Sequence, residues 1–222
     1  LCRSHGVTFV GPAPELMARM GLKSPAKAAM RAAGLPVIPG SDGPLVDADD
    51  AARVAAEVGF PIILKADAGG GGRGMRLCHN DAEVRASFGL CSSEALSNFG
   101  SASVYLEKYL TGGRHIEVQV LVDNYGNAVH LGERECSVQR RHQKLTEESP
   151  SPALTQNERE ELGAMAAAAS ALVGYTGAGT IEFLRASPNE KVGAGELYFM
   201  EMNTRLQVEH PVSELVTGID LA

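Results

Sequence analysis

The 222-residue sequence lacks any apolar run of about 18 residues, so we expect no membrane-spanning helix. It also lacks an excess of positive charge, because 27 acidic residues outnumber 20 basic ones and the formal net charge is −7. This balance argues against a broad nucleic-acid surface. It leaves a phosphate-rich small molecule open as a ligand, since a local pocket can be basic on an acidic protein.

Cysteine is scarce and widely spaced. The four cysteines are Cys2, Cys78, Cys91 and Cys136, and no pair has the close spacing of a metal knuckle or a redox motif. In a chain of this length we expect buried thiols of a reducing compartment, not a disulfide frame. The first residues do not resemble a secretion signal. We therefore expect a cytoplasmic or organellar matrix protein that is not secreted.

Local patterns predict a small α+β lobe in the first half of the chain. A proline- and glycine-rich stretch, residues 36–44, indicates a lobe boundary. Ser24 and Asn80 are expected to cap helices. Helices are predicted over residues 15–20, 25–33 and 49–58 and from residue 81, and strands over residues 7–10, 61–66, 75–78 and 103–109.

The second half predicts a larger antiparallel sheet. Apolar residues alternate from Ile116 to Val122, which is typical of a strand with one buried face. Residues 124–127 form a predicted hairpin turn, so that residues 128–138 return beside the first strand. A helix is predicted over residues 156–173, and two further strands over residues 179–185 and 196–203.

Five glycines occur in the seven residues 68–74, between two predicted strands. Glycine N–H groups can approach phosphate oxygens closely. No Gly-Lys-Ser/Thr follows, so the stretch is not a P-loop. The dinucleotide pattern needs a helix after the loop, whereas a strand is predicted here. A flexible surface turn and a phosphate-covering hairpin with Lys65 beside it both remain compatible with the sequence.

Residues 199–209 have one polar face if they are extended. Acids and amides on this face are oxygen ligands that suit Mg²⁺, and Glu182 on the preceding strand can join them. Arg205 can clamp a small carboxylate-like anion with two hydrogen bonds. A solvated sheet face is an equally good interpretation from spacing alone. The polar face consists of Glu201, Asn203, Arg205, Gln207 and Glu209.

A compact basic segment, residues 139–144, follows a predicted strand. A solvated charge run is the simplest interpretation. No aromatic residues interleave, which argues against nucleic acid. An anion site for phosphate and bicarbonate is the alternative. His115 becomes a candidate for the same site because Glu117 and Gln119 share its strand face.

Six stretches together resemble the biotin carboxylase family, and they occur in that family's order over nearly the whole chain. They are residues 40–44, 69–75, 106–110, 136–144, 177–180 and 201–211. The resemblance implies an α+β, ATP-grasp fold with a glycine-loop lid. It implies the end of an N-terminal lobe and linker helices at 1–37, the lid at 38–109, and an incomplete C-terminal lobe at 110–222. Asp67-Ala68 departs from the Ser-Gly that is common in the family.

The resemblance also implies roles for individual residues. Catalysis and bicarbonate binding fall to Lys144, Arg205, Gln207, Val208 and the general base Glu209. Metal ligands are Glu182, Glu201 and Asn203. ATP-binding residues are Lys23, Lys65, Gly69, Gly70, Gly71, Gly72, Gly74, Glu107, Lys108, Leu110, His115, Gln139, His142, Glu182, Leu184 and Glu201.

By the same resemblance, the protein is expected to carboxylate biotin with bicarbonate, using ATP and Mg²⁺ (or Mn²⁺), through carboxyphosphate. Biotin would be a substrate on a carrier domain. Further partners would be a carboxyltransferase and a second copy of the enzyme, within an acyl-CoA, pyruvate or urea carboxylase. The family's later region is not in this sequence. Two alternatives remain open: another ATP-grasp carboxylate ligase, similar to carbamoyl-phosphate synthetase, and a non-catalytic ATP-binding fragment.

Overall fold

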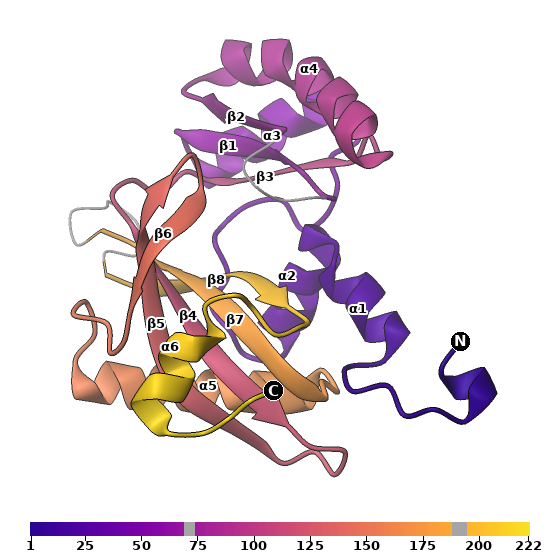
Figure 1. Ribbon diagram of the computed structural model, residues 1–222. Coiled ribbons are helices and arrows are strands. Elements are labelled where there is room, and N and C mark those ends of the chain that lie inside the picture. The colour runs from indigo at the N-terminus through magenta and orange to yellow at the C-terminus, as the bar shows by residue number, and fades with distance from the viewer. Residues whose placement is uncertain (69–73, 188–194) are drawn as a thin grey trace.

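The computed structural model of the protein describes residues 1–68, 74–187 and 195–222, and it arranges them around two separate antiparallel sheets (Figure 1). The smaller sheet has the strand order β2-β1-β3, and the larger has the order β6-β5-β4-β7-β8. The two sheets confirm the predicted α+β class. None of the helices in these described ranges combines the length and apolar character that a bilayer crossing needs.

The N-terminal segment differs from its prediction. Residues 7–10 form no strand, and Val7, Phe9 and Val10 are largely exposed, because no described strand offers them backbone hydrogen bonds. A short 3₁₀ helix, η1 (Arg3–His5), precedes them, and the helix α1 (Pro14–Met20) follows.

The next helix, α2 (Lys23–Ala32), begins two residues before its expected start, so Ser24 is not its cap. Instead, Asp67 Oδ1 accepts a hydrogen bond of 2.7 Å from the backbone N–H of Ser24. The Asp67 carbonyl also accepts from the N–H of Lys23 at 3.0 Å. Asp67, which stands where the family commonly has serine, is therefore buried and caps α2. Its negative charge complements the positive N-terminal end of that helix.

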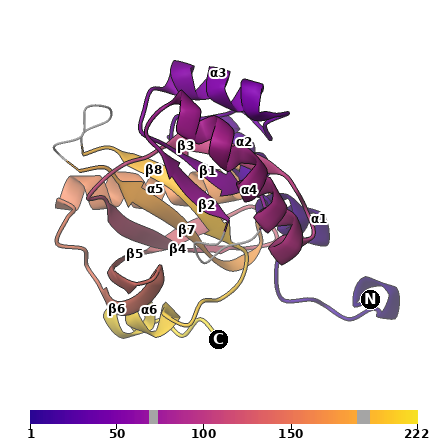
Figure 2. The same ribbon diagram turned by 90° about the horizontal axis from the view of Figure 1, so that it is seen from above.

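The small sheet carries two helices on one face (Figure 2). Its strands are β1 (Ile62–Ala66), β2 (Met75–Cys78) and β3 (Val104–Lys108), and its helices are α3 (Ala48–Val58) and α4 (Asp81–Phe99). Asn80 caps α4 as predicted, by accepting from the N–H of Glu83. Ile62, Leu64 and Leu106 are fully buried beneath the helices, which leaves the opposite face of the sheet directed at the larger lobe.

The large sheet consists of β4 (Arg114–Val122), β5 (Ala128–Arg140), β6 (Gln143–Glu148), β7 (Gly177–Arg185) and β8 (Leu197–Asn203). The helix α5 (Gln156–Leu172), which starts with a capping box at Thr155, packs on its apolar face. The alternation predicted for β4 is confirmed, because Ile116, Val118 and Val120 are buried in this core. Glu117 and Gln119 therefore project from the opposite face.

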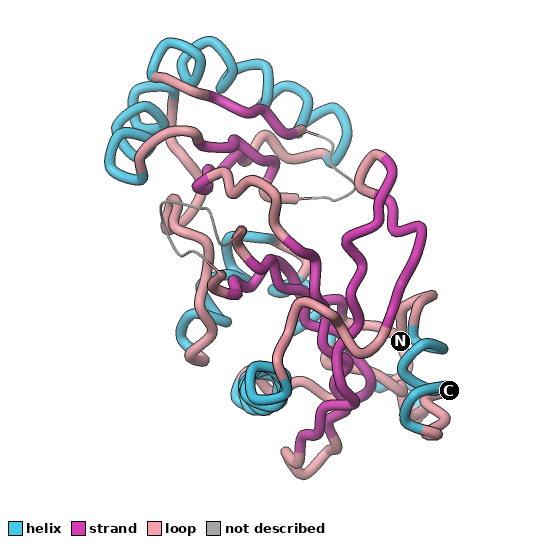
Figure 3. Tube along the Cα trace, turned by 90° about the vertical axis from the view of Figure 1, so that its left-hand side faces the viewer, coloured by secondary structure: helices cyan, strands magenta, loops and turns pink. Residues whose placement is uncertain are grey.

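Two elements of the large lobe escape prediction. The strand β6 returns beside β5 after a tight turn at Arg141 and His142, whose φ angles of 52° and 63° are left-handed. Its sequence, Gln-Lys-Leu-Thr-Glu-Glu, shows no apolar alternation because it forms an edge of the sheet. The β5–β6 hairpin extends toward the small lobe (Figure 3). The helix α6 (His210–Thr217) was also not predicted.

The proline- and glycine-rich connection runs along both sheets. The Pro36 carbonyl accepts from the N–H of Phe199 in β8 at 2.8 Å, and the Pro39 carbonyl accepts from that of Lys108 in β3 at 2.7 Å. Gly40 lies so close to β3 that a Cβ atom there would be 2.2 Å from the Leu106 carbonyl oxygen. Only glycine allows this approach.

We expect Gly40→Ala to destabilise the protein by about 1–3 kcal/mol, because backbone must move to admit the methyl group. Gly43→Ala is the matched control, since a Cβ at Gly43 would meet nothing within 4 Å. Thermal unfolding of both variants checks this. Equal melting temperatures for Gly40→Ala and the unsubstituted protein would contradict the close approach.

Candidate active site

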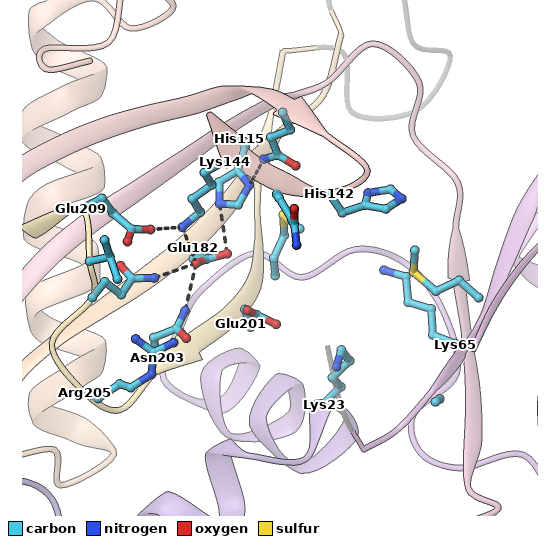
Figure 4. Close-up of a pocket in the computed structure, with 17 residues that line it drawn as sticks. Lys23, Lys65, His115, His142, Lys144, Glu182, Glu201, Asn203, Arg205 and Glu209 are labelled. Carbon is cyan, nitrogen blue, oxygen red and sulfur yellow. Dashed lines mark hydrogen bonds and ion pairs between the residues drawn. The ribbon is translucent and has the colours of Figure 1, made fainter. Parts of the chain in front are cut away.

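A cavity of about 730 Å³ lies between the two sheets (Figure 4). The structure brings thirteen of the predicted site residues to its lining: Lys23, Lys65, His115, Gln139, His142, Lys144, Glu182, Glu201, Asn203, Arg205, Gln207, Val208 and Glu209. Four residues that were not predicted complete it: Ala66, Met75, Gln143 and Met200.

Strand register explains why charged residues meet on the floor of this cavity. Arg134 of β5 is directly opposite Glu117 of β4, Glu117 is opposite Glu182 of β7, and Glu182 is opposite Glu201 of β8. These four side chains form one row across the polar face of the sheet. Three like charges at neighbouring positions repel one another. The row is therefore stable only with cations beside it.

Lys144, on the edge strand β6, is the cation at the centre of the row. Its Nζ contacts the carboxylates of Glu117, Glu182 (2.9 Å) and Glu209 (2.5 Å). Burial alone would lower the pKa of Lys144, but these carboxylates raise it above its usual value. Burial would likewise raise the pKa of Glu209, but the hydrogen bond from Lys144 holds it below its usual range. Lys144 is therefore charged and Glu209 is ionised at neutral pH.

Glu182 is the most extensively hydrogen-bonded carboxylate of the row. Its Oε1 accepts from Lys144, from the amide of Asn203 (2.9 Å) and from the amide of Gln207 (3.0 Å). Its Oε2 lies 3.0 Å from Nε2 of His115. Burial opposes ionisation of Glu182, but His115 and Lys144 outweigh it and lower the pKa to about 2.

Glu201 is in the opposite situation. Within the part of the chain that the structure describes, no hydrogen bond or ion pair to its carboxylate is found, although Glu182 lies opposite on the next strand. Burial and the Glu182 charge raise the pKa of Glu201. Lys23 faces the same region, and burial lowers its pKa. A half-buried carboxylate that has no hydrogen bond or ion pair within the described residues, beside a second carboxylate, favours a cation.

These residues fit a divalent metal in their chemistry. Glu182, Glu201 and Asn203 project from paired positions of β7 and β8 and offer carboxylate and amide oxygens, the ligands that Mg²⁺ prefers. Asn203 at present directs its amide nitrogen at Glu182. Binding of a cation between the two glutamates would require the amide to turn its oxygen inward.

On the lid side, Lys65 of β1 is held by Glu107 of β3. Glu107 accepts from Lys65 Nζ at 2.6 Å and from Lys27 Nζ at 3.0 Å, and its side chain is buried. Burial would raise the pKa of Glu107, but the two lysines lower it. The Glu107 side chain therefore lies behind Lys65 and does not line the cavity.

Other predicted residues lie away from the cavity lining. Lys108 donates to the carbonyls of Gly59 and Phe60, and Leu110 and Leu184 pack in a small apolar cluster between the lobes. Gly74 precedes β2 with a φ of 65°. The predicted phosphate-loop residues Gly69, Gly70, Gly71 and Gly72 lie outside the described residues.

The strand predicted over residues 196–203 is confirmed, but the extended backbone considered for residues 199–209 does not continue past Asn203. The strand β8 ends at Asn203, the chain bends at Arg205, and α6 begins at His210. The last residue of β8, Asn203, pairs with Thr180 of β7. Gln207 is buried while Val208 is 91% exposed. Strand alternation therefore does not explain why Arg205, Gln207 and Glu209 all line the cavity. They reach it from the loop between β8 and α6.

The pKa of Glu182 gives a pH prediction. Because its folded pKa of about 2 lies below its ordinary value of 4.5, its contribution to stability is fully present above pH 4.5. It is lost as the pH falls toward 2, and we expect it to reach at most about 3 kcal/mol. Urea unfolding between pH 5 and pH 3 should show a smaller loss of stability for Glu182→Gln than for the unsubstituted protein. Parallel stability curves would contradict this assignment.

The chain is similar to known proteins over its whole length. Residues 23–222 match the family described as the carbamoyl-phosphate synthase L chain, ATP binding domain. The biotin carboxylase of Nostoc sp. and biotin carboxylase 1 of Bacillus subtilis are each 52% identical over 221 residues. The match covers 100% of this chain but 48% of either relative, so the chain spans about half the length of the curated relatives it matches.

Solved structures share the fold of this chain. A biotin carboxylase complex from Campylobacter jejuni superposes with a TM-score of 0.93 at 51% identity, covering 99% of this chain and 48% of that one. The biotin carboxylase domain dimer of the Hydrogenobacter thermophilus 2-oxoglutarate carboxylase was solved with MgADP, ADP and bicarbonate. It gives a TM-score of 0.92 at 49% identity, with 99% of this chain and 47% of that chain covered.

Proposed function

This chain belongs to the family of the carbamoyl-phosphate synthase L chain ATP-binding domain and, within it, to the biotin carboxylases, and on that premise we propose that it carries out ATP-dependent carboxylation of biotin with bicarbonate. It has the predicted ATP-grasp fold. The observation that carries the proposal is the contact of Lys144 with Glu117, Glu182 and Glu209 on the floor of the interlobe cavity. This cluster holds one cation and one ionised base within reach of a small anion.

The nucleotide is proposed to lie between the two sheets. Lys23 and Lys65 reach the cavity from opposite lobes, so both ammonium groups can contact phosphate oxygens. The glycines Gly69, Gly70, Gly71, Gly72 and Gly74 are proposed to cover the phosphates. Residues proposed to hold the adenosine are Glu107, Lys108, Leu110, His115, Gln139, His142 and Leu184, of which Leu110 and Leu184 belong to one apolar cluster.

Glu182, Glu201 and Asn203 are proposed to hold Mg²⁺ or Mn²⁺. When bound, the metal neutralises phosphate charge and bridges the nucleotide to the protein. The cross-strand register supports this proposal, since it brings the two glutamates opposite each other. The raised pKa of Glu201 supports the proposal, because burial and Glu182 oppose its charge until a cation is present.

Bicarbonate is proposed to lie at the other end of the row. Lys144, Arg205 and the Gln207–Val208 segment line this part of the cavity together with Glu209. Glu209 is ionised, so it can accept the proton of bicarbonate. An oxygen of bicarbonate then attacks the γ-phosphorus, the bond to ADP breaks, and carboxyphosphate forms. Its breakdown gives phosphate and carbon dioxide, and the carbon dioxide bonds to N1 of biotin as the N1 proton passes to the phosphate.

Partners and boundaries are proposed from the same family. The Hydrogenobacter domain was solved as a dimer, which supports a homo-oligomer here. A biotin carrier and a carboxyltransferase are the further proposed partners. We also propose that residues 1–37 end an N-terminal lobe, that 38–109 form the lid, and that 110–222 belong to the C-terminal lobe.

The test is ATP cleavage by the intact protein, measured with bicarbonate and free biotin present or omitted. We expect ADP release that requires bicarbonate and that biotin increases. Release that requires ammonia in place of biotin would instead support a carbamoyl-phosphate-type ligase, in agreement with the family description. Binding of ATP without any cleavage would support a non-catalytic nucleotide-binding protein and overturn the proposal.

A further inference from the structure

Arg134 of β5 is a fully buried guanidinium that the function proposed above does not use. Its three nitrogens donate to five acceptors on three elements (β4, β7 and α6) and one loop, and a guanidinium has five N–H groups in a fixed plane. The acceptors are Glu117 Oε1 (2.7 Å), Gln119 Oε1 (2.8 Å), Ser213 Oγ (2.8 Å), Gln207 Oε1 (3.0 Å) and Thr180 Oγ1 (3.3 Å). Every N–H group of Arg134 therefore has an acceptor, and the side chain is held in one conformation.

Two of these contacts act on the cavity lining, one directly on Gln207 and one on Lys144 by way of Glu117. The Gln207 amide has its oxygen on Arg134 and its nitrogen on Glu182, so the guanidinium decides which way the amide faces. Glu117 has Oε1 on Arg134 and directs its other oxygen to Lys144. Arg134 thus acts through Gln207 and Glu117, although it does not itself line the cavity.

The same guanidinium anchors the loop after β8 at two points. Residues 204–209 have neither strand nor helix pairing, and Val208 projects into solvent. Gln207 is 5% exposed, and Ser213, in the first turn of α6, is 1% exposed. Both side chains reach Arg134. The segment between them carries Val208 and Glu209, so Arg134 holds it against the sheet from both sides, in addition to the contacts of Lys144 with Glu209 and of Gln207 with Glu182.

We propose that Arg134 is a positioning residue for bicarbonate. Its guanidinium fixes the loop 204–209 and the Gln207 amide over the sheet. This inference rests on the proposed function. Lysine cannot replace arginine in this role, because an ammonium has three donors and no planar fork.

The test uses Arg134→Lys, Gln207→Ala and the double variant in the intact protein, with KM measured separately for bicarbonate and for ATP. We expect Arg134→Lys to raise the KM for bicarbonate by about tenfold or more, and the KM for ATP by less than about twofold. Because Arg134 acts through Gln207, it should add less than about twofold to the effect of Gln207→Ala.

Arg159→Lys is the matched control. Arg159 is a guanidinium of α5 that pairs with Glu133 at 2.7 Å and lies outside the cavity. We expect Arg159→Lys to lower the melting temperature without changing the KM for bicarbonate relative to the KM for ATP.

If Arg134→Lys does not fold, Ser213→Ala provides the alternative variant, because it removes the contact with α6 and keeps the charge of Arg134. We then expect about a threefold rise in the KM for bicarbonate alone.

An unchanged KM for bicarbonate in folded Arg134→Lys, an equal rise in both KM values, or full additivity in the double variant would overturn the inference and leave the proposed function standing. For Ser213→Ala, an unchanged KM for bicarbonate would do the same. Absence of bicarbonate-dependent ATP cleavage in the unsubstituted protein would overturn the proposed function, and the inference with it.

Discussion

Glu209→Gln is expected to lower bicarbonate-dependent ATP cleavage by about 10²–10⁴-fold, the usual contribution of a general base. Glu209 lines the cavity, and Lys144 holds its carboxylate in the ionised form. The amide is nearly isosteric but cannot accept a proton. Since Lys144 keeps Glu117 and Glu182 as partners, the substitution should leave the nucleotide site in place, and the affinity for ATP should change little.

The control for this experiment is Glu214→Gln, five residues further along the chain in α6. Its carboxylate is half-buried, contacts His210 at 3.7 Å and does not line the cavity. We expect its turnover to stay within about twofold of the unsubstituted protein. Turnover of Glu209→Gln within the same range would show that Glu209 is not the base.

Glu201→Gln is expected to change stability and metal binding in opposite directions. Burial and repulsion from Glu182 raise the pKa of Glu201, so its charge destabilises the metal-free protein above its ordinary pKa. Removal of that charge should therefore raise the melting temperature in a chelator. The same change removes a proposed ligand, so the affinity for magnesium nucleotide should fall by about 10–100-fold.

Glu135→Gln provides the contrast. Glu135 is also buried, but Ser151, Ser137 and Arg114 hydrogen-bond its carboxylate and lower its pKa against the effect of burial. This variant should lose stability with or without metal and keep its affinity for nucleotide. Melting curves in EDTA and calorimetric titration with MgATP distinguish the two cases. A Glu201→Gln protein that melts lower in EDTA and binds MgATP normally would contradict the metal site.

Periodicity in the sequence was sufficient to predict the faces of the central strands. In β4 and β7, apolar and polar residues alternate because one face packs on α5 and the other does not, so Glu182 was correctly assigned to the polar face. The predicted end of this strand, at residue 203, is also confirmed by β8. The course of residues 204–209 was not predictable in this way, because Arg134 and Lys144, which hold this loop through Gln207 and Glu209, lie 73 and 65 residues away along the chain.

Arg134 shows the limit more clearly. It lies between Glu133 and Glu135, a local pattern typical of an exposed strand, yet all three residues are buried. Their partners come from β4, β7, α5 and α6 and from the loop after β8, at separations of 15–79 residues for Arg134. Only the folded sheet brings such acceptors together. Similarly, Lys27 carries no local sign that it shares Glu107 with Lys65.

The central claim is that an oxygen of bicarbonate attacks the γ-phosphate in the cavity above Glu182 and Glu209. Labelling bicarbonate with ¹⁸O and analysing the inorganic phosphate released by the intact protein tests it directly. Attack by bicarbonate leaves one labelled oxygen on each phosphate, because the carboxyphosphate bond that later breaks is the one between that oxygen and carbon. Phosphate that carries oxygen from water alone would mean simple ATP hydrolysis and would contradict the account.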